Sequence, residues 1–326
     1  MRLSCLINNY NYGRFVAEAV DSALSQSAPF DEIIVVDDGS NDQSLAVLSA
    51  LEQRCPRLKV VRKPNGGQLS AFSAGLAAST GDVLYFLDAD DLFEPNYVER
   101  TAGVFQTRPD VGYVFSGRRL FGRIERVERP FSDEIDLGYS VAVLATGGVW
   151  CGASTSCVSM RRSTLERLLP APDMDPLWRI NADLCLAYGA SLAGVRKYCV
   201  PEPLVAYRVH DHNAHYGKPE DAAGKYQRRL QAQTLIEHYS RRLGLDRAQL
   251  AELLHLEFMT VPKPTHAMLK RYLRTTLASR SRLTRRIGLA WTIWRHYYRS
   301  RHAPAPIAAR YEQRRDLNLY TPAKAS

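Results

Sequence analysis

The sequence lacks three patterns by which several classes of protein are recognised. Its six cysteines form no CxxC pair, so neither a zinc-finger spacing nor a disulfide framework is readable, and a reducing compartment is favoured. The apolar segment 3–7 is not followed by GxGxxG, which argues against an NAD site. That segment is too short for a signal peptide, and no apolar run reaches membrane-spanning length. A cytoplasmic protein is therefore expected.

Acidic residues are scarce in the last third of the chain. The net charge is +9, but residues 1–220 hold 22 Lys/Arg against 27 Asp/Glu, whereas residues 221–326 hold 21 against 7. Between positions 259 and 310 there are 12 Lys/Arg and no acidic residue. Such a basic region indicates an anionic surface as partner, either lipid headgroups or nucleic acid.

The first half of the chain alternates strand and helix signals. Short unbroken apolar runs, typical of parallel strands buried on both faces, lie at 3–7, 33–36, 59–61, 83–87 and 111–115, with further runs at 195–200 and 204–207. Helical spacing appears at Val16, Val20 and Leu24, at Leu45, Leu48 and Leu51, and over 69–79. This order predicts an α/β fold with an open, mostly parallel sheet and helices on both faces.

Regular signals are fewer in the second half. Residues 117–155 show no clear pattern. The segment 163–166 has the form of a capping box that opens a helix, and Asn181 is placed to cap another. The following pattern is helical, interrupted by prolines. We therefore expect a catalytic domain over 1–218 and a basic helical region over 219–326.

Acidic residues follow two of the predicted strands. Asp37 and Asp38 end the strand 33–36, and Asp88, Asp90 and Asp91 end the strand 83–87. Ligands of open α/β sheets bind beyond the carboxyl ends of the strands. Three carboxylates within four residues repel one another unless a cation or hydrogen-bond donors compensate them. A divalent ion such as Mg²⁺ or Mn²⁺ would do so and would also bridge to a diphosphate. The alternatives are a solvated acidic turn and, for the first pair, a helix cap.

Five segments in register resemble the family 2 glycosyltransferases of the GT-A fold. They are LSCLINNYNY (3–12), SALSQS (22–27), EIIVVDDGSND (32–42), NGGQ (65–68) with Ala71 and Gly75, and GDVLYFLDADD (81–91). The resemblance covers about two-thirds of the chain. It implies a Rossmann-like, GT-A type sheet and metal-dependent, inverting transfer of a sugar from a nucleotide-sugar donor to an acceptor hydroxyl. Cell-surface polysaccharide or glycolipid synthesis is the implied setting.

The resemblance also implies roles for individual residues. Those that would bind the nucleotide-sugar are Tyr10, Asp38, Asn65, Gly67, Asp88 and Arg208. Tyr10 would stack on the base, Asp38 would accept a hydrogen bond from it, and Asp88 would contact the ribose. Asp90 would hold the metal and His210 would reach the metal or the diphosphate, with Arg208 supporting the same phosphate. Without the resemblance, Tyr10 could simply pack at the sheet edge and His210 could be structural.

Asp183 is the candidate catalytic base. Many members of the family carry Glu-Asp before a helix at this point, whereas this chain has Ile180-Asn181-Ala182-Asp183. The resemblance implies that Asp183 deprotonates the acceptor hydroxyl. The alternative is an acidic first-turn residue that complements the helix dipole.

The basic tail contains an amphipathic pattern. Leu283, Ile287, Trp291, Trp294 and Tyr298 recur at helical spacing and are flanked by arginines at 282, 285, 286, 295 and 299. An apolar stripe with tryptophans and an Arg-rich flank is typical of a helix in a membrane interface, which would suit a lipid-linked acceptor. The alternatives are that the stripe packs on the catalytic domain or that the tail binds nucleic acid, for which no module is recognisable.

Two other readings compete with a glycosyltransferase. A nucleotidyltransferase also uses acids at a sheet edge, but it needs a Gly-rich, cation-bearing loop after the first strand, and Asn8–Gly13 has no cation before Arg14. A catalytically weak, glycosyltransferase-like scaffold would bind partners or membrane through the tail. The intact acidic cluster at 88–91 argues against it.

Overall fold

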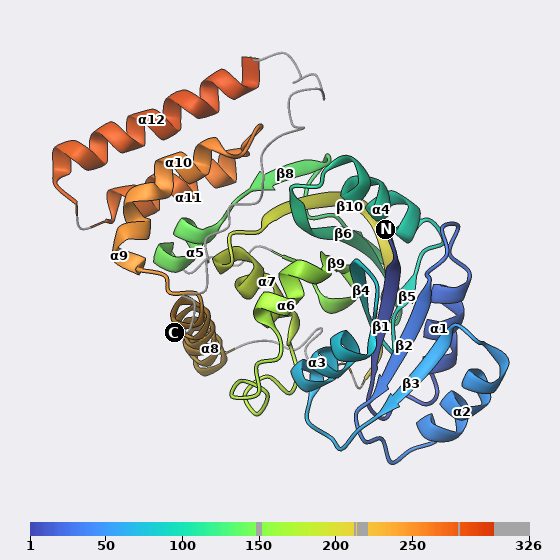
Figure 1. Cartoon of the computed structure of the whole chain (residues 1–326). Coiled ribbons are helices and arrows are strands. Elements are labelled where there is room, and N and C mark those ends of the chain that lie inside the picture. The colour runs from blue at the N-terminus through green and yellow to red at the C-terminus, as the bar shows by residue number, and fades with distance from the viewer. Residues whose placement is uncertain (148–151, 212, 214–220, 280, 303–326) are drawn as a thin grey trace, which may run out of the picture.

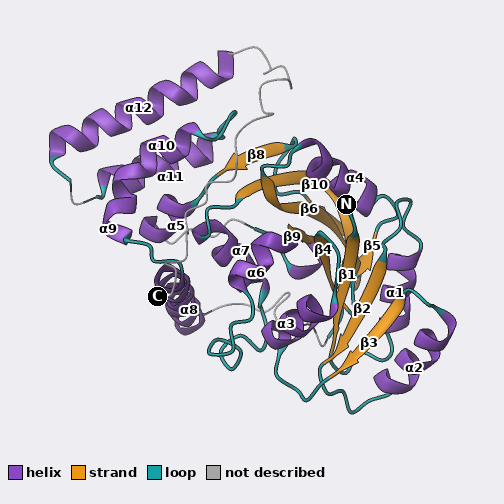
Figure 2. Cartoon of the chain, viewed as in Figure 1, coloured by secondary structure: helices purple, strands orange, loops and turns teal. Residues whose placement is uncertain are grey.

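A ten-stranded mixed sheet runs through the protein in the computed structural model, which describes residues 1–147, 152–211, 213, 221–279 and 281–302 (Figures 1 and 2). The strand order is β3-β2-β1-β4-β9-β6-β10-β5, with β7 paired to β6 and β8 to β10. The strands are β1 (Leu3–Asn9), β2 (Glu32–Asp37), β3 (Leu58–Arg62), β4 (Val83–Asp88), β5 (Leu92–Phe93), β6 (Val111–Gly122), β7 (Arg126–Glu128), β8 (Ile135–Gly138), β9 (Val158–Arg161) and β10 (Arg196–Val209).

The parallel half of the sheet brings polar strand ends together. Strand β1 lies between β2 and β4, and all three run in the same direction. The register pairs Asn9 with Asp37 on one side of β1 and Asn8 with Asp88 on the other. Apolar runs thus fill the middle of the sheet, while amides and carboxylates collect at one edge.

Helices cover both faces of the sheet, as predicted. The helices before β9 are α1 (Val16–Leu24), α2 (Ser44–Arg54), α3 (Gln68–Ala78), α4 (Tyr97–Thr107), α5 (Val141–Gly147) and the 3₁₀ turn η1 (Thr155–Cys157). Those after β9 are α6 (Arg162–Leu168), α7 (Asp183–Leu192), α8 (Ala222–Arg242), α9 (Arg247–Leu250), η2 (Ala251–Leu253), α10 (Leu254–Met259), α11 (His266–Leu277) and α12 (Leu283–His302).

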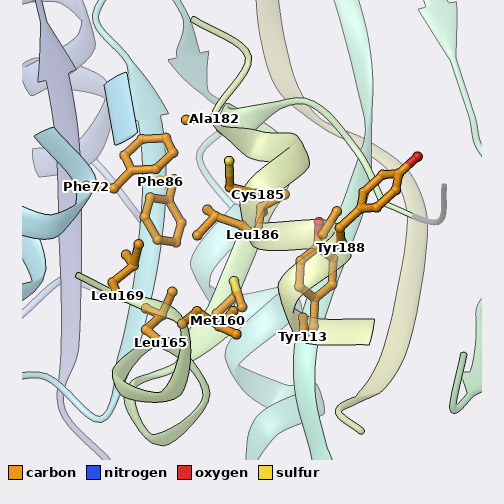
Figure 3. Close-up of a cluster of buried hydrophobic side chains, with 14 of the residues drawn as sticks. Phe72, Phe86, Tyr113, Met160, Leu165, Leu169, Ala182, Cys185, Leu186 and Tyr188 are labelled. Carbon is orange, nitrogen blue, oxygen red and sulfur yellow. The ribbon is translucent and has the colours of Figure 1, made fainter. Parts of the chain in front are cut away.

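Alternate residues of the central strands enter two separate cores. Cys5 and Tyr85 pack with α1, α2 and α4 on one face. Leu6 and Phe86 pack on the other face with α3, α6 and α7, where Phe72 meets Phe86 with ring centroids 4.9 Å apart (Figure 3). Burial on both sides explains why these strands read as continuous apolar runs.

The second half is more regular than its sequence indicated. The segment 117–155 contains the end of β6, strands β7 and β8, and helix α5. The expected strands 195–200 and 204–207 form one strand, β10, because register shifts let it pass Pro201 and Pro203 while still pairing with β6. Irregular pairing of this kind leaves no clean period in the sequence.

The two expected helix caps are also corrected. Helix α6 begins at Arg162, before the proposed box at 163–166, and its N-cap Arg161 makes no side-chain capping bond. Helix α7 is capped by Ala182, whereas Asn181 has a φ of 58° and lies outside the helix. An asparagine tolerates the left-handed conformation, and here it turns the chain into the helix.

The C-terminal helices pack on the sheet-bearing part of the chain. Leu235, Ile236 and Tyr239 of α8 belong to the same core as Leu186 of α7. Helices α10, α11 and α12 form a smaller core with Ala142 and Val143 of α5. The predicted boundary at 218/219 falls outside the described residues and stays a prediction. None of the helices in the described ranges is long and apolar enough to cross a membrane.

Candidate active site

A cavity of about 360 Å³ lies at the edge where β1, β2 and β4 end. Seven of the nine predicted site residues line it: Tyr10, Asp38, Asn65, Gly67, Asp88, Asp90 and Asp183. The other two, Arg208 and His210, are not among its lining residues, although both contact Asp90. The structure therefore brings together residues that are up to 173 positions apart in the sequence.

Asp38 is a buried carboxylate that is held by donors from the loop after β3. Its Oδ1 accepts from the Lys63 ammonium and from the backbone N–H of Gly66 at 2.9 Å, and its Oδ2 accepts from the N–H of Gly67 at 2.7 Å. These contacts compensate its charge and fix the loop against β2. Tyr10, which is 47% exposed, lines the same cavity.

Gly67 allows a second segment to cross the start of α3. Its φ is +91°, and a Cβ there would lie 2.5 Å from the Cα of Arg179. The backbone N–H of Gln68 donates to the carbonyl oxygen of Arg179 at 2.9 Å, while the guanidinium of Arg179 donates to Asn65 Oδ1. Asn65, Gly67 and Gln68 thus hold the segment that leads to Asp183 against the loop after β3.

Asp88 ends β4 among polar partners. Asn8 Nδ2 and Gln68 Nε2 donate to its Oδ1 at 2.7 and 2.9 Å. Burial, together with the charge of Asp90, raises the pKa of Asp88 to about 7. A cation placed beside this carboxylate would favour its ionised form.

Asp91 holds the acidic turn to the neighbouring segments η1 and β10. It is buried, and its Oδ2 accepts from Ser156 Oγ at 2.6 Å while its Oδ1 accepts from the backbone N–H of Arg208 at 2.9 Å. Burial and the charge of Asp90 hold its pKa well above the ordinary value. The same Ser156 hydroxyl accepts from the Asp88 N–H at 3.1 Å, so one residue of η1 bonds to both ends of the acidic turn.

Asp90 and His210 form a pair that suits a divalent ion. His210 Nε2 lies 3.1 Å from Asp90 Oδ2, and the imidazole packs beside Tyr12 and Phe15. Asn213 Oδ1 accepts from the His210 backbone N–H at 2.6 Å and fixes the strand end. Within the described ranges, no group of three or more His, Cys, Asp or Glu is arranged to hold a metal. Two protein ligands still fit an ion that also takes substrate phosphates and waters.

Arg208 is engaged by its neighbours. Its Nε donates to the carbonyl oxygen of Asp90 at 2.9 Å and its Nη2 lies 2.8 Å from Glu18 Oε2. The guanidinium also stacks on the rings of Phe15 and Phe121, 4.5 and 4.6 Å from the centroids. The structure thus gives Arg208 a place behind the acidic turn, and its contact with a phosphate stays a prediction.

Asp183 is the first residue of α7 and lines the cavity. Burial raises its pKa to about 6. Its Oδ1 accepts from the N–H of Leu184 at 3.0 Å, a first-turn contact of the kind that the dipole alternative predicts. The two roles are compatible, because the helix terminus stabilises the carboxylate while the cavity leaves it open to a ligand.

Residue-level reasoning missed two polar residues of the site. Gln68 donates to Asp88 and to Thr155 Oγ1, and its Oε1 accepts from the N–H of Ala182 at 2.9 Å. Asn8 holds Asp88 from β1. Both lie inside the segments that carry the resemblance, at 65–68 and 3–12. The signal that could have found them was an amide beside each predicted acidic strand end.

Sequence comparisons place the chain among sugar-transferring proteins. The model of the family described as Glycosyl transferase family 2 matches residues 4–169. An uncharacterized glycosyltransferase from Nostoc sp. is 38% identical over 219 residues, 66% of this chain and 67% of that protein. The chondroitin synthase of Pasteurella multocida is 34% identical over 117 residues, which are 36% of this chain but 12% of that enzyme.

Solved structures extend the likeness beyond the matched family model. TarS from S. aureus in complex with UDP aligns with a TM-score of 0.57 at 15% identity over 92% of both chains. The mannosyltransferase PcManGT from Pyrobaculum calidifontis, in complex with GDP-Man and Mn²⁺, aligns with a TM-score of 0.50 at 19% identity over 94% of this chain and 77% of that one. The predicted GT-A type fold is confirmed.

Proposed function

Since this chain belongs to glycosyl transferase family 2 and is a glycosyltransferase, we propose that it is a metal-dependent, inverting enzyme that moves a sugar from a nucleotide-sugar to an acceptor hydroxyl. The observation that carries this proposal is the shared cavity. The same cavity is lined by Tyr10 and Asp38, by Asp88 and Asp90 of the acidic turn, and by Asp183. A donor and an acceptor can therefore meet between an acidic cluster and a separate base.

Recognition of the donor is assigned to the β1–β2–β4 edge. Tyr10 stacks on the nucleotide base, Asp38 accepts a hydrogen bond from it, and Asp88 accepts from the ribose hydroxyls. Asn65 and Gly67 shape the wall beside it. The structural relatives bind UDP, UDP-GlcNAc or GDP-Man, which supports a nucleoside diphosphate sugar as the class of donor.

The transfer itself is assigned to Asp183. With a pKa of about 6, this carboxyl is ionised at neutral pH and is basic enough to take the proton of the acceptor hydroxyl. The hydroxyl oxygen then bonds to the anomeric carbon as the bond from that carbon to the diphosphate oxygen breaks. Attack from the side opposite the leaving group inverts the anomeric centre.

The leaving diphosphate needs charge compensation that carboxylates cannot provide. Asp90 and His210 would hold Mg²⁺ or Mn²⁺, and the bound ion would neutralise the diphosphate as it departs. Arg208 keeps the carbonyl of Asp90 in place and would stabilise the same phosphate region through its charge.

The acceptor is proposed to be a glycan or a lipid-linked molecule in polysaccharide or glycolipid synthesis. The protein would act from the cytoplasmic side as a peripheral protein, with the catalytic unit over 1–218 and the basic helices over 219–326. The charge of the second unit supports this arrangement, because it is strongly basic while the first is mildly acidic. Nucleic acid is not proposed as a partner.

The test is a thermal-shift screen of nucleoside diphosphates and sugar nucleotides with Mn²⁺, followed by an assay of sugar-nucleotide hydrolysis. A ligand that binds the native state raises the melting midpoint, and an active enzyme releases the nucleoside diphosphate. We expect Asp90→Asn to abolish the Mn²⁺-dependent part of both signals. Asp21→Asn, an exposed change on α1, should leave them intact. A protein that binds a diphosphate but never turns over any sugar nucleotide would instead be a scaffold.

A further inference from the structure

One face of helix α12 is apolar, aromatic and exposed. The residues of this face, here called the α12 stripe, are Leu283, Ile287, Trp291, Trp294 and Tyr298, which are between 38% and 60% exposed. At about 100° per residue they fall within an arc of about 80° around the helix. The rings of Trp291 and Trp294 stack with centroids 4.8 Å apart, and Trp294 lies 4.3 Å from Tyr298. The alternative that this stripe packs on the catalytic domain is thus wrong.

A different face of α12 attaches it to the protein. Ile293 and Tyr297 are buried in the small core with Phe258 and Tyr272, and His296 Nε2 lies 2.9 Å from the carbonyl oxygen of Val261. Helix α12 forms the outermost layer beyond α10 and α11 (Figure 1). Because the attached face is already used, the α12 stripe is presented to the surroundings on a rigid support.

Positive charge borders the α12 stripe. Arg295 and Arg299 are exposed and follow it along one side, while Arg282 precedes it. The 12 Lys/Arg between 259 and 310 meet no acidic residue within that stretch. An apolar face whose edge is basic attracts an anionic surface that is itself apolar underneath.

We propose that the α12 stripe is the surface by which this protein binds a bilayer that contains anionic lipids. Trp291, Trp294 and Tyr298 lie at the level of the headgroups, where aromatic residues with one polar end are favoured. Arg295 and Arg299 contact lipid phosphates. This inference gives the peripheral association within the proposed function a defined surface, and it does not depend on the donor chemistry.

Two other occupants fit the face less well. A second copy of the chain, joined through the same face, would bring identical arginines against one another without acidic partners. A nucleic acid would engage the arginines but would leave Leu283 and Ile287 in water. A lipid surface satisfies the charged and the apolar residues together.

The experiment is co-sedimentation of the full chain with vesicles of phosphatidylcholine alone or of phosphatidylcholine with about 30% of the anionic lipid phosphatidylglycerol. We expect binding to the anionic vesicles and its weakening at high salt. The double variant Trp291→Ala/Trp294→Ala should lower the partition coefficient about tenfold or more, since it removes the largest apolar area of the face. Arg295→Gln/Arg299→Gln should lower it on anionic vesicles alone.

Matched controls separate the outcomes. Tyr226→Ala removes an aromatic side chain that is 66% exposed on α8 and should bind vesicles like the parent protein. Absence of binding to anionic vesicles, or equal binding by the tryptophan double variant, would overturn the proposal. So would a lipid-free dimer that the double variant dissociates, because the face would then belong to a second copy. Binding of nucleoside diphosphate in the same samples tells a failed surface from a failed donor site.

Discussion

Gln68 Nε2 donates a hydrogen bond to Asp88 Oδ1 over 2.9 Å, which joins the first residue of α3 to the last residue of β4. The opposite end of the same amide, Oε1, accepts from the backbone N–H of Ala182, the residue before Asp183. One side chain therefore connects the carboxylate assigned to the donor with the helix that presents the base. Both ends are engaged, so the amide fixes the distance between Asp88 and the start of α7.

We expect Gln68→Leu to impair turnover more than donor binding. The change keeps the size of the side chain but leaves the Ala182 N–H without its acceptor, at a cost of about 1–3 kcal/mol. The start of α7 then shifts, and kcat should fall at least about tenfold while the KM for the donor changes less. Steady-state kinetics measure this split, with Ser73→Ala on α3 as a control. Equal losses in kcat and in donor affinity would show a general disturbance instead.

The raised pKa of Asp183 predicts an acidic limb in the rate. The carboxyl accepts a proton only when ionised, so kcat should fall as the pH drops through about 6 and level off above it. The measurement is a pH–rate profile between about pH 5 and 8, a range that covers the titration of perturbed carboxyls and of histidine. Asp183→Asn should lose most activity and the limb with it. A limb that persists in Asp183→Asn belongs to another group.

The Asp90–His210 pair predicts graded metal dependence. Asp90→Asn removes a charged ligand, and His210→Gln removes a neutral one, so the first change should weaken Mn²⁺ binding more. We expect a loss of at least about tenfold in metal affinity for His210→Gln, the smallest loss usual even for residues that only support a ligand. Titration of Mn²⁺ against the diphosphate-bound protein measures both. A parent-like Mn²⁺ affinity in both variants would remove the pair from the metal site.

The sheet-bearing half of the chain was predictable because its strands are buried on both faces. Residues of β1 such as Cys5 and Leu6 enter opposite cores, so most of the strand is apolar until the two amides at its end, Asn8 and Asn9. The parallel order then places Asp38, Asp88 and Asp90 at one edge. This geometry needs no knowledge of side-chain contacts.

The rest of the site depended on contacts between distant segments. The sequence around Arg208 predicts an arginine that contacts a ligand phosphate. Nothing in that short segment shows that the guanidinium is held by Glu18 and two aromatic rings. Ser156 likewise lies in a segment without periodicity, and its bond to Asp91 appears when η1 packs against β4. Interactions that span 65 or more positions leave no trace in a short window of sequence.

Glu257 of α10 attaches the C-terminal helices to α5 through buried hydrogen bonds. Its carboxylate is buried and accepts from the backbone N–H of Ala142 and Val143 at 2.6 and 2.9 Å, at the start of α5, and from Tyr272 Oη at 2.8 Å. Glu257→Gln replaces one acceptor oxygen by an NH₂ group that faces these donors. The free energy of unfolding should fall by about 1–3 kcal/mol.

Tyr272→Phe removes one donor of the three and should cost less, about 1 kcal/mol. Glu252→Gln, which breaks a surface pair with Arg285, should change stability by less than either, within about 0–1 kcal/mol. Thermal and urea unfolding measure these losses, and the loss of stability should decrease in the order Glu257→Gln, Tyr272→Phe, Glu252→Gln. The same hydrogen bonds attach α10 and α11, on which α12 packs, to α5. Glu257→Gln should therefore also bind anionic vesicles more weakly than the parent protein. If unfolding of Glu257→Gln matches that of Glu252→Gln, the buried carboxylate does not fasten α10 to α5.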